Sequence, residues 1–184
     1  MDSILEMFSI GIGPSSSHTV GPMKAANSFI HHCEDQQVLQ SISRIQVVLY
    51  GSLSLTGLGH GTDRAIIAGL EGYTPETVDT DYVLHIVEEK TLTKVLHAVQ
   101  SYDIDFDYHR DIQFDKWQRL AFHPNGMRFI AYNGENICCE EVWYSTGDGF
   151  IQQGLVDDEV IANHAVKHVQ KYHQQRRRGL GDLP

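Results

Sequence analysis

The sequence has few cysteines, and their arrangement excludes several kinds of site. Among its 184 residues are three cysteines: Cys33 stands alone, and Cys138 and Cys139 are adjacent. Neighbouring side chains on a strand point to opposite faces, so the adjacent pair is poorly arranged to bind one metal ion. A 4Fe–4S cluster usually takes more thiolates than this chain could bring together. An odd number of cysteines without a disulfide pattern is typical of a reducing compartment, so we expect a cytoplasmic protein.

Positive charge and long apolar runs are also scarce. Fourteen lysines and arginines stand against 24 aspartates and glutamates, which gives a net charge of −10. Such a chain repels phosphate backbones, and this argues against a nucleic-acid partner. No apolar run approaches the roughly 20 residues of a membrane span, and the N-terminus lacks the basic segment of a signal peptide. We therefore expect neither nucleic acid nor membrane as a partner.

The hydrophobic periodicity predicts an α+β fold. The Asn133-Gly134 dipeptide between two alternating segments is a strong hairpin signal. Apolar residues on both faces of 42–50 place that strand near the centre of the sheet. We expect a mixed sheet of about four to five strands with helices packed on it. The expected domain covers residues 1–155, followed by a helix and linker over 156–184. The expected helices are 23–33, 64–70, 91–101 and 158–178, the expected strands are 42–50, 82–87, 127–131, 137–144 and 150–151, and 102–116 is expected to be irregular.

A loop rich in serine and glycine is the first candidate site. Residues 11–22 contain three glycines, two prolines and three serines, which indicates a shaped loop before a helix. Small hydroxyl side chains and the unpaired amides of a helix start form a natural anion site, and His18 adds a group that titrates near neutral pH. The candidates are Ser15, Ser16, Ser17, His18 and Thr19. The alternative is a loop whose hydroxyls only cap the helix.

A second glycine-rich segment, residues 51–61, contains His60. Flanking glycines leave the imidazole accessible, and Asp63 could orient it as the partner of a general base. The alternative is an ordinary solvated histidine. A functional role for His60 is better supported if this segment and the serine-rich loop lie together in the folded protein.

Four blocks of the sequence resemble bacterial iron–sulfur-dependent L-serine dehydratases. The first is residues 11–23, GIGPSSSHTVGPM, whose composition is unusual and specific. The second begins at residues 50–57, YGSLSLTG, and continues through His60 and Asp63. The others are 125–134 and 144–150, so the resemblance covers nearly all of the expected domain.

The resemblance implies the β part of an enzyme that converts L-serine to pyruvate and ammonia without pyridoxal phosphate. The family's α part carries the cysteines for a 4Fe–4S cluster, and the linker-like 179–184 is where that part would begin. The implied partners are L-serine, the α part and a second copy in a homodimer. The β part is also similar in fold to the substrate-binding domain of some phosphoglycerate dehydrogenases. Ser52 and Ser54 join the candidate contacts to the substrate.

Two hypotheses remain open. In the first, the chain contributes to catalysis. His60 takes the Cα proton and is oriented by Asp63, and His18 is the rival candidate for the base. The hydroxyls bind the substrate carboxylate. In the second, it is a non-catalytic module for amino-acid binding, regulation and dimerisation. The two are distinguished by whether residues 14–19 and 57–63 lie on one exposed concave face, and the second gains if they are far apart.

Overall fold

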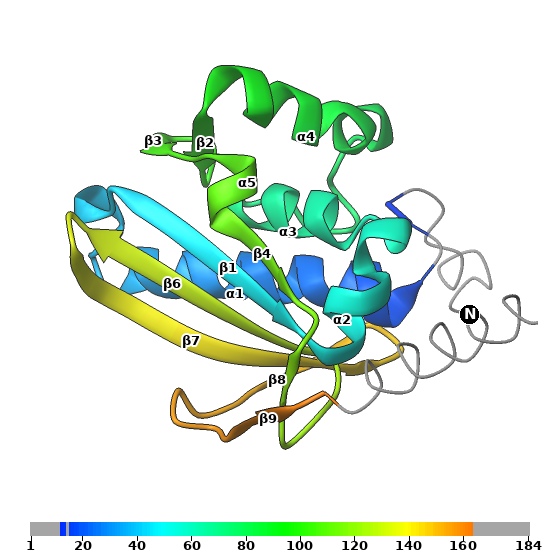
Figure 1. The fold of residues 1–184 in the computed structure, drawn as a ribbon. Coiled ribbons are helices and arrows are strands. Elements are labelled where there is room, and N and C mark those ends of the chain that lie inside the picture. Colours follow the sequence, from blue (N-terminus) through cyan, green and yellow to red (C-terminus); the bar gives the residue numbers. More distant parts are fainter. Residues whose placement is uncertain (1–11, 14, 164–184) are drawn as a thin grey trace, which may run out of the picture.

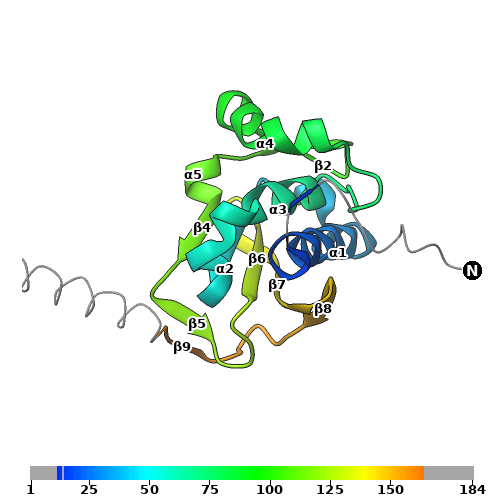
Figure 2. The same ribbon diagram turned by 90° about the vertical axis from the view of Figure 1, so that its right-hand side faces the viewer.

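The computed structural model describes residues 12, 13 and 15–163, and its centre is a mixed sheet (Figures 1 and 2). The strand order is β2-β3-β1-β6-β7-β8, and β4 also pairs with β1. β1 is parallel to β3 and β4 but antiparallel to β6, so the expected α+β class is confirmed, with seven strands rather than about four to five. The strands are β1 (Arg44–Tyr50), β2 (Val95–Ala98), β3 (Tyr102–Asp105), β4 (Ile112–Asp115), β6 (Gly126–Asn133), β7 (Asn136–Gly147) and β8 (Phe150–Gln153).

Helices cover one face of this sheet (Figure 1). The long helix α1 (Gly21–Asp35) packs on β7 and on α3 (Thr62–Leu70), and α4 (Thr80–Thr93) packs on α3 from outside. The apolar stripe of α1 is fully buried, and Phe29 stacks on Phe129 of β6 with ring centroids 5.2 Å apart. The shorter helices are η2 (Ser16–Val20), η3 (Leu39–Ser41), α2 (Gly51–Thr56), η4 (Gly57–His60) and α5 (Tyr108–Asp111).

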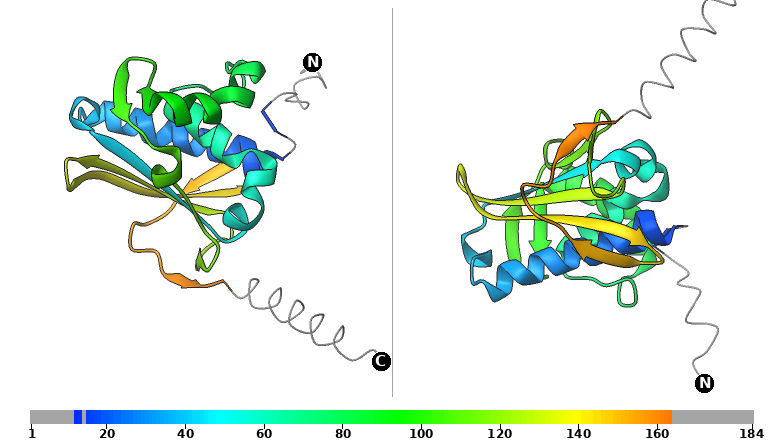
Figure 3. Two further views of the ribbon diagram at one scale, coloured as in Figure 1. Left: turned by 45° about the horizontal axis from the view of Figure 1, so that its top comes forward. Right: turned by 90° about the horizontal axis from the view of Figure 1, so that it is seen from below.

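The opposite face carries a smaller apolar cluster. Val48 and Tyr50 of β1 meet Val142 and Tyr144 of β7 there, together with Leu120. Leu120 belongs to a separate two-stranded sheet of β5 (Gln118–Leu120) and β9 (Val160–Ala162). The chain between β8 and β9 crosses beneath β7 (Figure 3). The prediction that β1 has apolar residues on both faces and lies centrally is confirmed.

Three predicted elements are wrong. Residues 82–87 are not a strand, because the Asp79 carboxylate caps a helix over them by accepting from the amide of Asp81 at 2.8 Å. That helix ends at Thr93, so the helix expected over 91–101 is replaced by the end of α4 and by β2. Residues 160–162 pair with β5 as a strand, which contradicts the start of the helix expected over 158–178. The remainder of that expected helix and the linker, residues 164–184, lie outside the described residues.

The aspartate-rich segment 102–116 is also more regular than expected. It forms β3, α5 and β4. Asp107 accepts from the amides of His109 and Arg110 and so caps α5, while the Arg110 guanidinium pairs with Asp105 and Asp111. These carboxylates therefore stabilise local structure.

Candidate functional site

The serine-rich segment is the start of a long helix. Ser15 is the N-cap, and its hydroxyl accepts from the amide of His18 at 3.3 Å. Residues 16–20 form the single π-helical turn η2, which runs directly into α1. The expectation that 11–22 form an irregular loop is therefore wrong from Ser16 onward. The amides of Ser16 and Ser17 have no acceptor among the described residues, as expected at a helix start.

The second glycine-rich segment is helical as well, and Pro124 fixes where it begins. Gly51 has φ +56°, and a Cβ on it would lie 2.3 Å from the Pro124 carbonyl oxygen, so only glycine fits. The amide of Ser52 donates to the same oxygen at 2.9 Å. The loop expected over 51–61 is thus replaced by α2 and η4, which emerge from the end of β1.

The two segments meet in space. The Thr19 hydroxyl donates to the carbonyl oxygen of His60 at 2.9 Å, and the Thr62 hydroxyl donates to the carbonyl of His18. The rings of His18 and His60 lie with their centroids 5.0 Å apart. The two segments are therefore not far apart, and both imidazoles stand beside the turn that leads into α1.

His18 is enclosed by hydroxyl groups. Its Nδ1 lies 2.9 Å from Ser17 Oγ, and its Nε2 lies 3.0 Å from Ser52 Oγ. Burial, and secondarily the nearby His60, lower the pKa of His18 below its ordinary value. The ring is therefore neutral at neutral pH. Both of its nitrogens are occupied by protein hydroxyls, so His18 orients Ser17 and Ser52.

His60 is arranged differently. Its Nδ1 lies 2.9 Å from the carbonyl oxygen of Thr56, one helical turn earlier. A carbonyl can only accept, so Nδ1 carries the proton and the neutral ring has its lone pair on Nε2. Among the described residues Nε2 has no hydrogen-bond partner, and the residue is half-buried. This is the arrangement that a general base requires.

Asp63 does not orient His60, contrary to the sequence-based expectation. Its side chain is 3% exposed, and its Oδ2 accepts from the Tyr108 hydroxyl at 2.6 Å. Burial and this carboxylate raise the pKa of Tyr108, so the phenol stays protonated. Asp63 therefore ties the first turn of α3 to α5, and the Thr56 carbonyl takes the orienting role that was expected of Asp63.

The predicted substrate-binding hydroxyls fall into two groups. Ser15, Ser16, Ser17 and Ser52 lie around the His18 ring or at the exposed helix start, with Ser15 and Ser17 joined by a 3.3 Å hydrogen bond. The other two point into the protein. Thr19 is fully buried against His60, and Ser54 is 2% exposed and donates to the Gly51 carbonyl at 2.8 Å.

Two residues that were not assigned a role also lie here. Asn125 and Ser145 exchange backbone and side-chain hydrogen bonds: the Ser145 amide donates to the Asn125 carbonyl at 3.0 Å, and the Asn125 side chain donates to the Ser145 carbonyl at 3.2 Å. The Ser145 hydroxyl is buried without a partner among residues 12, 13 and 15–163, and a Cβ on Gly21 would lie 2.0 Å from it. Both residues are in blocks that carry the family resemblance, but no spacing in the sequence places them beside α1.

The cysteines do not fit an iron–sulfur cluster. Cys33 of α1 and Cys139 of β7 are buried and their thiols are hydrogen-bonded, which raises the pKa of Cys33 and lowers that of Cys139. Cys138 donates separately to the Ala131 carbonyl. Within residues 12, 13 and 15–163 there is no group of three or more histidine, cysteine, aspartate or glutamate side chains that could hold a metal ion. No helix in the same part of the chain is long and apolar enough to cross a membrane.

Comparison with known proteins gives a family for the chain. The family described as serine dehydratase beta chain matches residues 3–155. L-serine dehydratase 1 of Escherichia coli is 44% identical over 172 residues, which are 92% of this chain and 36% of the relative. L-serine dehydratase of Streptomyces coelicolor is 40% identical over 160 residues, covering 86% and 34%. L-serine dehydratase TdcG of Escherichia coli is 45% identical over 152 residues, covering 82% and 33%. The chain thus spans about a third of these relatives.

Proposed function

Because the chain belongs to the serine dehydratase beta chain family, we propose that it is the β part of an L-serine dehydratase and supplies active-site groups for converting L-serine to pyruvate and ammonia. The observation that carries this proposal is the meeting of His18 and His60 at the start of α1. A purely structural module has no need for two adjacent imidazoles, one of which, His60, has a nitrogen without a hydrogen-bond partner in the part of the chain that the structure describes.

The helix start is suited to the substrate carboxylate. The amides of Ser16 and Ser17, which have no acceptor within the described part of the chain, and the positive end of the helix favour an anion there. The exposed hydroxyl of Ser16 adds a donor, and so does one of Ser17 and Ser52, because neutral His18 donates to one of these two hydroxyls and accepts the proton of the other. These fixed donors would stabilise the charge that develops on the carboxylate when the Cα proton is removed.

His60 is the proposed base for that proton. Nε2 of His60 accepts it, and the imidazolium keeps its Nδ1 hydrogen bond to the Thr56 carbonyl. Thr19 is a positioning residue in this scheme, because its buried hydroxyl holds the backbone of His60. Loss of the β-hydroxyl from the resulting carbanion gives an aminoacrylate, which tautomerises and is hydrolysed to pyruvate and ammonia.

In this proposal, groups outside this chain assist the departure of the β-hydroxyl of L-serine. The proposed cofactor is the 4Fe–4S cluster of the family, without pyridoxal phosphate, but the three cysteines here do not fit it. Its ligands would belong to an α part, on the same polypeptide or on a separate subunit. A cytoplasmic location and a homodimer stay part of the proposal, and the free thiols support a reducing compartment.

A chimaera tests this function. In it, this chain replaces the matching third of Escherichia coli L-serine dehydratase 1, and pyruvate formation from L-serine is measured. We expect activity, and we expect it to be strongly reduced in the His60→Ala chimaera. An inactive chimaera that still shows the cluster absorbance of the parent enzyme would contradict the catalytic role and favour the regulatory or dimerisation module.

A further inference from the structure

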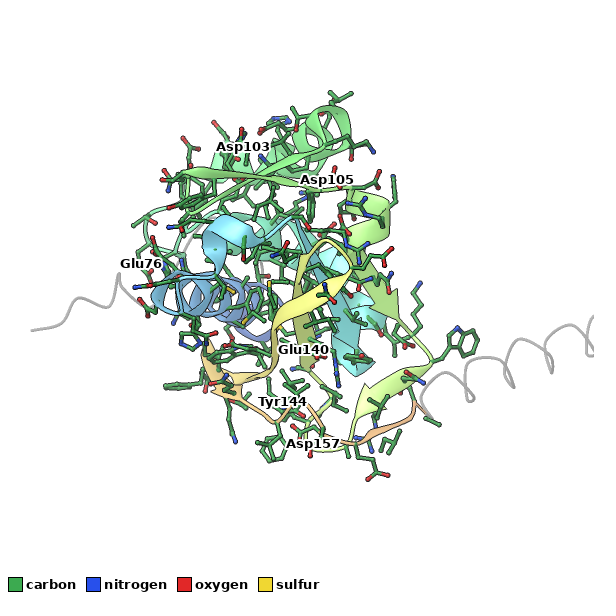
Figure 4. The ribbon with its side chains drawn as sticks, turned by 90° about the vertical axis from the view of Figure 1, so that its left-hand side faces the viewer. Glu76, Asp103, Asp105, Glu140, Tyr144 and Asp157 are labelled. Atoms are coloured by element: carbon green, nitrogen blue, oxygen red, sulfur yellow. The ribbon has the colours of Figure 1, made fainter. Side chains whose placement is uncertain are left out.

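A small cavity lies on the sheet face opposite α1. Its volume is about 240 Å³, and Phe122, Tyr144, Gln152, Leu155 and Asp158 contribute to its lining. Tyr144 and the neighbouring Asp157 lie on the same side of the sheet, away from Asp103 and Asp105 (Figure 4). Ser145 faces α1 from the other side of β7, so this cavity is separate from the His18–His60 site.

One carboxylate is fixed in the cavity with an unoccupied oxygen. Oδ2 of Asp158 accepts both from the Tyr144 hydroxyl at 2.7 Å and from the Leu155 amide at 3.0 Å. Oδ1 has no partner among the described residues. Two donors on one oxygen hold the group in a single orientation, and its free lone pairs are available to a donor that enters the cavity.

Aromatic rings form the wall beside this carboxylate. The rings of Phe122 and Tyr144 have centroids 4.9 Å apart at an angle of 50°. Tyr144 is 1% exposed, whereas Phe122 is 59% exposed, so the Phe122 side chain is the part of this wall that solvent reaches. Ring faces attract cations and cover short apolar chains. Carboxylate and rings together are the usual recognition elements for an organic ammonium group.

The basic side chains near the cavity do not repel a bound cation, because one is paired with a carboxylate and the other is neutral. Arg128 of β6 lies on this face, but its guanidinium is paired with Glu140 at 2.7 Å. The His123 ring centroid is 6.4 Å from that of Tyr144, and burial lowers the pKa of His123, so this ring is neutral at neutral pH. The chain as a whole carries a net charge of −10.

We propose that this cavity binds a small primary ammonium compound. The ammonium group donates to Oδ1 of Asp158, and its short carbon chain lies against Phe122 and Tyr144. The volume of about 240 Å³ is below the usual range for drug-sized ligands, roughly 300–1,000 Å³, so a nucleotide is too large and a simple amine or an amino acid fits.

The test is a titration of the full chain with n-butylammonium chloride, followed by the ¹H and ¹⁵N shifts of the Leu155 and Gly154 amides. We expect saturable shifts with a millimolar dissociation constant. Equal concentrations of sodium butyrate and of neutral butanol are the chemical controls. An arm with L-valine distinguishes an amino-acid site from a site for plain amines.

Asp158→Asn is the matched variant, because its amide oxygen can still accept from Tyr144 and Leu155 while the charge is gone. We expect butylammonium to bind about 10- to 100-fold more weakly to it, the usual value of a hydrogen bond to a charged group. Glu159→Gln removes the same charge next door and should bind like the parent. The proposal is overturned if butylammonium gives no saturable shifts, if butanol or butyrate gives the same shifts, or if Asp158→Asn binds like Glu159→Gln.

Discussion

Two polar clusters in this molecule differ in how completely the protein pairs their groups. In the first, Lys90 of α4 pairs with Glu71 at 2.7 Å, and both side chains are buried, at 0% and 1% exposure. Glu71 also accepts from the Tyr82 hydroxyl and, at 3.1 Å, from the amide of His97. The carboxylate is therefore satisfied on both oxygens by the protein itself. It joins α4 and β2 to the end of α3, and it has nothing left to offer a ligand.

In the second cluster, the His18–His60 site, the pairing is incomplete. The amides of Ser16 and Ser17 and Nε2 of His60 have no partner among the described residues. The neighbouring hydrogen bonds fix the direction in which these two amides and this nitrogen point, but they do not involve the amide protons or the nitrogen lone pair themselves. The comparison teaches that buried, fully paired polar groups stabilise the fold, whereas groups that are oriented but unpaired are the ones to test for function.

The largest expected difference between variants of the two clusters is in kcat. His60→Ala in the active chimaera should lower kcat by about 10²–10⁴-fold, the usual contribution of a general base. Its thermal midpoint should change little, because the side chain is half-exposed. Steady-state pyruvate assays and thermal unfolding check both. His31→Ala, at an exposed histidine of α1 whose Nδ1 lies 3.1 Å from a carboxylate oxygen of Glu34, is the control and should retain the parental kcat. A loss below about tenfold would move the role of base away from His60.

The structural cluster should respond in the opposite way. Lys90→Met leaves the Glu71 carboxylate buried without its cation and should lower the free energy of unfolding by about 3–5 kcal/mol. The double variant Lys90→Met/Glu71→Met removes both charges and should recover a large part of that loss. Urea unfolding of this chain measures both. If the single variant were as stable as the parent, the ion pair would not hold this region together.

A smaller difference is expected between two serines. Ser16→Ala should raise KM for L-serine several-fold, with a smaller change in kcat, because its hydroxyl is at the exposed start of the helix. Ser54→Ala removes a buried hydrogen bond to the Gly51 carbonyl and should lower stability by about 1 kcal/mol without changing KM. Equal KM values for the Ser16 variant and the parent would exclude that hydroxyl from substrate binding.

The smallest expected effect is on the pH dependence of stability. Burial and His60 lower the pKa of His18 from 6.5, so the unfolded chain binds the proton at a higher pH than the folded one. The stability that neutral His18 contributes is complete above about pH 6.5 and is lost as the pH falls below it. The free energy of unfolding should therefore drop more between pH 7.5 and 5.5 in the parent than in His18→Asn. Identical drops would show that His18 titrates normally.

The fold was predictable where one local signal dominates. Alternation and the Asn133-Gly134 turn gave the β6–β7 hairpin, and helical spacing gave α1. The predictions for residues 82–101 were wrong because a run of β-branched and aromatic residues resembles a strand. The Asp79 cap at one end and the C-cap residue Lys94 at the other, with φ +57°, define a helix there instead. Here capping outweighed intrinsic propensity.

The two segments of the candidate site could be picked out from the sequence, but their local structure could not. Glycine, serine and proline indicate a loop, yet η2 and α2 are helical, because Ser15 caps one helix and the Pro124 carbonyl fixes the start of the other. The misassignment of Asp63 has a different cause. Its true partner, Tyr108, is 45 residues away in sequence, and no local pattern reports that contact.

The central claim is that Nε2 of His60 takes the Cα proton, and the kinetic isotope effect with [2-²H]-L-serine tests it most directly. The effect on kcat should be measured in the active chimaera, with and without His60→Ala. If His60 is the base, its removal slows the proton-transfer step selectively, so the isotope effect in the variant rises to its intrinsic value, or stays there if the parent already expresses it. A variant whose kcat falls while its isotope effect shrinks would contradict the account, because another step would then have lost its catalyst.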